Sequence, residues 1–197
     1  MVKLLLYIKH HLTFIWSIVE WCNSMLFYVL YGKRLKNTVK NIGTLSNRPD
    51  LVFRSIEAND LKGLETFFSE QPKEAFKFFN PHGFDLESLR KINRNKAFLM
   101  IGCYKDNVLA GYCFLRFFAN KQAFRGKIVD PRFQGQGIAK EMGRLTTEIC
   151  RKMEFRLFAT ISKDNVKSIA SSKAVNDVKI VKELPDGYYY VEYLNKK

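Results

Sequence analysis

The first part of the chain carries a helical pattern of apolar and polar positions. Large apolar side chains fill most of residues 3–31, and no proline interrupts them. Polar residues that step by three or four positions fall on one narrow stripe of a helix: His10, Thr13, Ser17, Glu20, Ser24 and Tyr28. The pattern predicts an amphipathic helix over residues 1–32 with a large apolar face.

This helix is open to three interpretations: it lies in the plane of a membrane surface, it spans the bilayer, or it docks on protein. Burying the charge of Glu20 in hydrocarbon costs about 2.5 to 3.5 kcal/mol, which counts against spanning. Four basic residues follow, and anionic headgroups attract each by about 1 kcal/mol: Lys33, Arg34, Lys36 and Lys40. These features favour peripheral membrane contact through residues 1–32, with the protein in the cytoplasm at the inner face of the membrane.

Residues 33–50 are basic and polar, lack a regular period and predict a linker. From residue 51 on, helical and strand periods alternate quickly. They predict strands near 51–56, 97–104, 108–118, 122–129, 156–161, 178–181 and 188–193, and helices near 61–68, 73–79, 86–92, 136–153 and 165–175. We therefore expect one domain over residues 51–197, of the α/β class, with a mixed, mostly antiparallel central sheet flanked by helices.

Composition agrees with one packed domain and limits its partners. The chain has 197 residues, of which 47% are hydrophobic, and a formal net charge of +14. Such a surface attracts phosphate groups, but no zinc-finger or RRM signature accompanies the charge, so nucleic acid is not an expected partner. The four cysteines are widely spaced and predict reduced core residues, and no ligand set at metal spacing is present.

The residues between the strand at 122–129 and the following helix read Val-Asp-Pro-Arg-Phe-Gln-Gly-Gln-Gly-Ile-Ala. Two glycines that open a helix favour an anion, because free backbone N–H groups and the positive end of the helix both face it. Neither the Walker A pattern nor the dinucleotide pattern fits. A turn without any ligand is the alternative for a single glycine pair.

These residues resemble the GNAT acetyltransferase superfamily. Its coenzyme A loop follows [RQ]-x-x-G-x-[GA], which Gln134, Gly137 and Ala139 match, and Val129 and Pro131 match the lead-in. The resemblance implies the GNAT fold, acetyl-CoA as co-substrate and no metal. It also implies that the backbone near Val129 pairs with the pantetheine arm, and that the pyrophosphate binds N–H groups of Gln134, Gly135, Gln136, Gly137, Ile138 and Ala139.

A second match is Asn165 with Ser168, which places Asn165 near the pantetheine, although an asparagine at a helix start is equally expected as a cap. In such enzymes the amine attacks the thioester directly. Where many relatives carry a proton-donating tyrosine, this chain has Ser172, so water or a tyrosine at 188–190 is the alternative donor. The strand at 122–129 offers no glutamate base, which leaves His82, either as a catalytic base or as a turn residue.

The acceptor is less well specified by the sequence. A membrane-associated enzyme with a basic surface suits an amino sugar on a nucleotide diphosphate or a lipid pyrophosphate, as in bacterial surface-polysaccharide assembly. A protein N-terminus, a lysine or a polyamine is the alternative acceptor, and a non-catalytic acyl-CoA-binding module is the alternative to an enzyme. The oligomeric state stays open, with a dimer among the allowed states.

Overall fold

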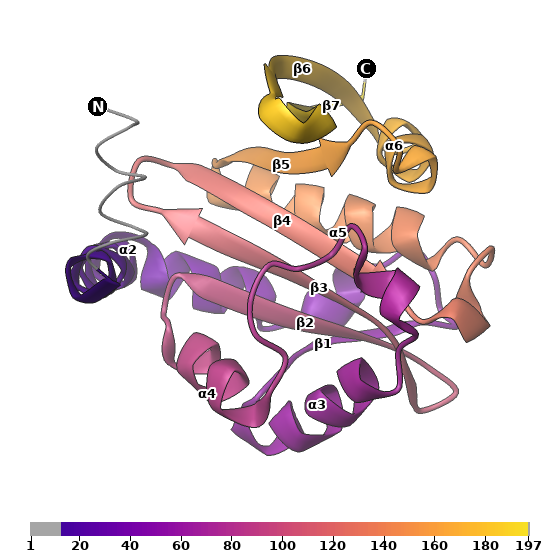
Figure 1. Ribbon diagram of the computed structural model, residues 1–197. Coiled ribbons are helices and arrows are strands. Elements are labelled where there is room, and N and C mark those ends of the chain that lie inside the picture. The colour runs from indigo at the N-terminus through magenta and orange to yellow at the C-terminus, as the bar shows by residue number, and fades with distance from the viewer. Residues whose placement is uncertain (1–12, 197) are drawn as a thin grey trace.

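Seven strands form one twisted sheet in the computed structural model, which describes residues 13–196, with side chains from residue 17 on (Figure 1). The strand order is β1-β2-β3-β4-β5-β7-β6, and only the β4–β5 neighbours run in parallel. The strands are β1 (Val52–Ser55), β2 (Phe98–Lys105), β3 (Val108–Phe118), β4 (Gln122–Val129), β5 (Arg156–Ser162), β6 (Asn176–Leu184) and β7 (Tyr188–Asn195). The predicted mixed, mostly antiparallel sheet is confirmed.

Helices cover both faces of this sheet. Side chains alternate between the faces along each strand: Tyr112 and Phe114 join the core under α3 and α4, whereas Cys113 and Leu115 join the core under α5 and α2. The helices are α2 (Thr13–Val39), α3 (Leu61–Ser69), α4 (Leu86–Arg94), α5 (Ile138–Met153) and α6 (Val166–Lys173). The predicted helix at 73–79 is a short 3-10 turn, Lys73–Phe76.

The N-terminal helix α2 docks on the domain. Phe27 is fully buried, stacks on Phe117 at a centroid distance of 5.0 Å and meets the edge of Phe155. Beside it, the amide of Asn23 donates to the Phe117 carbonyl oxygen and accepts from the N–H of Ala119. These contacts satisfy backbone groups at the end of β3, which would otherwise need water.

The polar stripe predicted for this helix faces the domain in part. Glu20 forms an ion pair with Arg116 at 2.9 Å, and the Ser24 hydroxyl accepts from the N–H of Lys96. His10 lies outside the described residues. With the polar groups turned inward, large apolar side chains of α2 are exposed to solvent: Ile18, Val19, Trp21, Leu26, Tyr28, Val29 and Leu30. We call these residues the outer face of α2.

The linker prediction is wrong over residues 33–39, where α2 continues. Leu35 and Val39 pack against the core, and Arg34 pairs with Glu154 at the end of α5 at 2.8 Å. Glu154 is 120 residues away in sequence, so the local pattern could not reveal this pair. Within residues 13–196, no helix combines the length and the apolar character needed to cross a bilayer.

We predict that Phe27→Ala destabilises the whole domain, because it removes the buried ring that joins α2 to β3. The expected loss is about 3 to 5 kcal/mol of the free energy of unfolding, measured by urea denaturation. Val29→Ala on the same helix is the matched control, since Val29 is 79% exposed, and it should change stability by less than about 0.5 kcal/mol. Equal, small losses in both variants would mean that α2 is not docked through Phe27.

Candidate functional site

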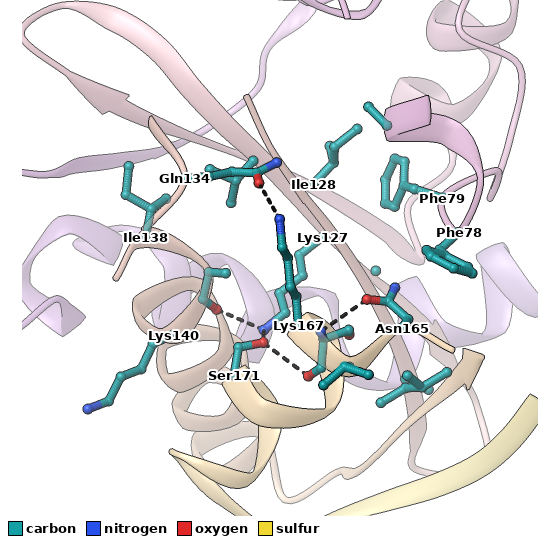
Figure 2. A pocket seen from close by; sticks show the side chains of 18 of the residues that line it. Phe78, Phe79, Lys127, Ile128, Gln134, Ile138, Lys140, Asn165, Lys167 and Ser171 are labelled. Atoms are coloured by element: carbon teal, nitrogen blue, oxygen red, sulfur yellow. Dashed lines mark hydrogen bonds between the residues drawn. The ribbon is translucent and has the colours of Figure 1, made fainter. Parts of the chain in front are cut away.

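The main cavity opens where β4 and β5 part. Their parallel pairing covers only Gln122 to Phe124 on β4, opposite Arg156 to Phe158 on β5. Beyond these residues the two strands separate, and a cavity of about 950 Å³ lies between them, with α5 and α6 on one side (Figures 1 and 2). Unpaired backbone groups at such a gap need another partner. The arrangement therefore suits an extended ligand that lies along β4.

The loop before α5 forms one end of this cavity. Gly135 and Gly137 adopt positive φ angles of 77° and 79°, which side-chain-bearing residues rarely adopt, and Gly137 is the N-cap of α5. The N–H of Gln134 donates to the Pro131 carbonyl oxygen at 3.3 Å. In the described part of the chain, no backbone acceptor meets the N–H groups of residues 135–139. They form a concave donor set at a helix start, as an anion requires.

Cations surround this loop. Arg48 donates to the Gln136 carbonyl oxygen at 3.0 Å, and Lys105 donates to the Gln136 side chain at 2.5 Å. Lys167 of α6 reaches across the cavity mouth to the Gln134 side chain at 3.1 Å (Figure 2). Lys140 also lines the cavity. Their charges add to the positive end of the α5 dipole and favour a polyanionic ligand.

The start of the loop is held by Asp130, which is buried. Its carboxylate accepts from the backbone and the guanidinium of Arg132, and also from Gln71 at 3.3 Å. These bonds, above all that from the Arg132 side chain, keep the pKa of Asp130 below its ordinary value. Asp130 therefore fixes the loop as a carboxylate.

Asn165 both caps a helix and lines the cavity. Its side-chain oxygen accepts from the N–H of Ser168 at 3.0 Å, which is the N-cap bond of α6. Asn165, Ser168 and Val129 all belong to the cavity lining. The two interpretations offered by the sequence are thus compatible.

Two basic side chains that the sequence analysis did not select line the cavity from β4. Arg125 is 6% exposed, donates to Gly143, Thr146 and Asn176, and lies 3.5 Å from the Tyr193 ring centroid. Lys127 donates to the Ala139 carbonyl oxygen at 2.8 Å and to the Ser171 hydroxyl at 3.0 Å. The signal was available, because charged residues at alternate positions of a buried strand share one face.

A family model described as "Acetyltransferase (GNAT) family" matches residues 64–172. The chain belongs to the GNAT acetyltransferase family. It is accordingly an acetyl-CoA-dependent N-acetyltransferase, and the predicted fold, enzyme class and co-substrate are confirmed. A search of curated protein sequences finds no match.

Solved structures agree on the GNAT fold. The GNAT domain of S. lividans PAT superposes with a TM-score of 0.62 at 17% identity, covering 73% of this chain and 90% of that one. RimL, a ribosomal L7/L12 alpha-N-protein acetyltransferase in complex with coenzyme A, superposes with a TM-score of 0.57 at 20% identity, covering 74% of this chain and 93% of that one. AAC(6')-Ib in complex with Parmomycin and acetyl-CoA superposes with a TM-score of 0.59 at 12% identity, covering 75% of this chain and 94% of that one.

The two residues predicted as catalytic, His82 and Ser172, are not part of the cavity lining. His82 lies among aromatic rings, with Nδ1 2.8 Å from the Gly83 carbonyl oxygen and Nε2 3.2 Å from the Tyr112 hydroxyl. Burial lowers the pKa of His82. Ser172 is fully buried, and its hydroxyl lies 3.3 Å from that of Tyr193, which does line the cavity. Their catalytic roles stay predictions. Ser172 reaches the cavity through Tyr193, whereas Tyr112, which contacts His82, is fully buried and is not part of the lining.

The buried cysteines lie outside the cavity lining. Burial raises the pKa of Cys103 and of Cys150 to about 12 and raises that of Cys113 further. Such thiols are not nucleophiles at neutral pH. Direct attack of an amine on the thioester needs none. Among residues 13–196, no cluster of His, Cys, Asp and Glu is arranged to hold a metal ion.

Proposed function

We propose that the cavity between β4 and β5 binds acetyl-CoA and presents its thioester to an amino sugar carried on a diphosphate. The N–H groups of residues 135–139 would hold the pyrophosphate. The pantetheine arm would lie along β4 from Val129 inwards, beside Asn165. The unpaired donor set at the start of α5 carries this proposal, because it matches two adjoining phosphates in charge and shape.

The size and lining of the cavity support the same ligand. A volume of about 950 Å³ is at the upper end for small-molecule sites, as a long cofactor requires. Its apolar wall, which includes Ile128, Ile138 and Ile161, suits a pantetheine chain, whereas polar groups gather at the loop. Holding the two reactants in one cavity lowers the barrier, because their loss of freedom occurs on binding.

The acceptor part of the proposal rests on residues 73–78 at the other end of the cavity. Glu74 lines it there together with Phe78 and Phe79, and the two rings are seen in Figure 2. An aromatic ring can stack on a sugar, and a carboxylate attracts an amine. Lys73 and Lys77 are exposed on the same turn, so they are available to a diphosphate on the acceptor.

Protein N-termini, lysines and polyamines remain the competing acceptors. The net charge of +14 disfavours polycations, since like charges slow their approach.

The loop assignment predicts that Gly137→Glu abolishes binding of acetyl-CoA. A side chain here would be strained by the φ of +79°, its Cβ would lie 3.2 Å from Arg48 Nη1, and its negative charge would oppose the pyrophosphate. We expect the affinity to fall by more than about a hundredfold in calorimetry. Gly63→Glu is the matched control, because Gly63 lies on α3 with open space around it. Undiminished binding by a folded Gly137→Glu protein would refute the assignment.

The acceptor assignment predicts that nucleotide-diphosphate amino sugars release thiol from acetyl-CoA faster than spermidine or an N-terminal peptide. Replacing both Lys73 and Lys77 by Ala should raise the acceptor KM about tenfold, equal to about 1.4 kcal/mol. The KM for acetyl-CoA should not change. A preference for spermidine or the peptide, or no effect of the double substitution on the acceptor KM, would contradict the amino-sugar diphosphate.

We also propose that the outer face of α2 contacts an anionic membrane surface. Trp21 and Val29 are 64% and 79% exposed, and large exposed apolar patches of this kind mark interaction sites. Lys33, Lys36 and Lys40 follow directly and are exposed, so the apolar face and the charges would meet a headgroup layer together.

This contact predicts that vesicles rich in phosphatidylglycerol bind the protein and shift its tryptophan fluorescence to shorter wavelength. Trp16 and Trp21 are the chain's two tryptophans, so a Trp16→Phe protein reports on Trp21 alone. Leu26→Asp combined with Val29→Asp should weaken partitioning at least about tenfold, whereas Thr66→Asp, at an exposed position of α3, should not. Absence of binding, or a dimer that these aspartates convert to monomer, would overturn the membrane proposal.

A further inference from the structure

A buried cation, Arg125, and a partly buried one, Lys127, lie side by side on the cavity wall without an acidic partner. Arg125 and Lys127 are two residues apart on β4, so they share the face that meets α5 and α6. Among the residues that the structure describes, neither forms an ion pair with a carboxylate, and the buried Nε of Arg125 meets no acceptor. Buried charges are normally paired, because an unpaired one loses its solvation. The presence of two such cations at a ligand cavity suggests that they stabilise a negative charge on the ligand.

Lys127 is placed to meet such a charge. Its ammonium group joins the first turn of α5, through the Ala139 carbonyl oxygen, to α6, through the Ser171 hydroxyl (Figure 2). These bonds use two of its three N–H donors and leave one for a ligand. Lys140 and Lys167 are exposed and line the mouth beside the loop, whereas Lys127 is partly buried at the wall.

The chemistry of the cavity requires a proton at one defined step. When an amine displaces coenzyme A, the C–S bond breaks and its electron pair stays on sulfur, so a thiolate forms inside the protein. The acidic side chains of the lining, Glu74 and Asp164, are exposed carboxylates that would repel it. The Tyr193 hydroxyl points to Ser172. Lys127 offers both a positive charge and a transferable proton.

We propose that Lys127 donates a proton from Nζ to the coenzyme A sulfur as the acetyl group leaves, with Arg125 as the fixed positive charge beside it. The new amide keeps the acetyl carbon, the sulfur gains the Nζ proton, and Lys127 becomes neutral. The proton that the attacking nitrogen loses passes to water and restores the ammonium form. This inference rests on the proposed acetyl-CoA site.

The electrostatics of this position agree with an acid that works near neutrality. Burial first, and then the charge of Arg125, lowers the pKa of Lys127 to about 7. Cys113, opposite Lys127 on β3, acts weakly in the other direction. The remaining charged or titratable groups of the lining are Glu74, Lys140, Asp164, Lys167 and Tyr193. A proton donor is most effective when its pKa lies near the working pH.

The first test needs no acceptor. Coenzyme A is bound to the protein, and its thiol is titrated by the ultraviolet absorbance of the thiolate. In the wild-type protein the bound thiol should ionise at lower pH than free coenzyme A, because the cations stabilise the thiolate. Lys127→Met should raise its pKa by about one unit, a tenfold change in the ionisation constant, and Lys127→Arg should keep it low. Lys62→Met, at an exposed position of α3, is the control.

The second test is the pH profile of single-turnover thiol release, with acetyl-CoA and the best amine of the acceptor panel. The wild-type rate should fall as pH rises through about 7, where the ammonium is lost. The rate of the Lys127→Met protein should be about a hundredfold lower, and it should not fall as pH rises through this range. Lys127→Arg keeps the charge but not a transferable proton, so its rate should also be low and should not fall as pH rises through about 7.

The outcomes separate this inference from the assignment of the cavity. If calorimetry shows that the wild-type protein does not bind acetyl-CoA, the proposed site fails. If binding is intact while Lys127→Met leaves both the thiol titration and the pH profile unchanged, Lys127 merely joins α5 to α6. Should Lys127→Met not fold, a Lys127→Arg protein whose rate still falls with pH as in the wild type would overturn the proposal.

Discussion

The structure depends on one interruption of hydrogen bonding, the early end of the ladder between β4 and β5. Three residue pairs join the strands, and then each backbone continues with one edge unpaired. A buried edge of this kind is costly unless something satisfies it. The antiparallel strands on both sides keep the two halves of the sheet rigid, so the gap persists as a shaped cavity. The loop, the start of α5 and the start of α6 all meet there.

Charge is distributed to suit this gap. The glycine loop and its ring of cations form an exposed, strongly positive end, whereas Arg125 and Lys127 place positive charge deeper, where water screens it less. In the proposed complex the two regions would meet different groups, since a phosphate is permanently charged and a thiolate is charged only during reaction. On the proposed assignment, one cavity would separate binding from catalysis along its length.

Local signals explain which parts of this arrangement could be predicted. The turn at Asp106 and Asn107 needs two positive φ angles, which these residues tolerate, so the β2–β3 hairpin could be predicted. The loop at Gly135 and Gly137 could be predicted for the same reason. The continuation of α2 depends on the packing of Leu35 and Val39 against the core, and the position of His82 depends on rings from several elements. Such long-range contacts leave no period in the sequence.

The docking of α2 has a consequence for any shortened form of the enzyme. Its inner side covers Phe117 and Phe155, and the outer face of α2 is a second apolar surface. Trimming the helix away to improve solubility would uncover the first surface while removing the other. A truncated protein would replace one exposed apolar surface by another and would tend to aggregate. Polar replacements on the outward side alone are therefore the sounder route to a well-behaved sample.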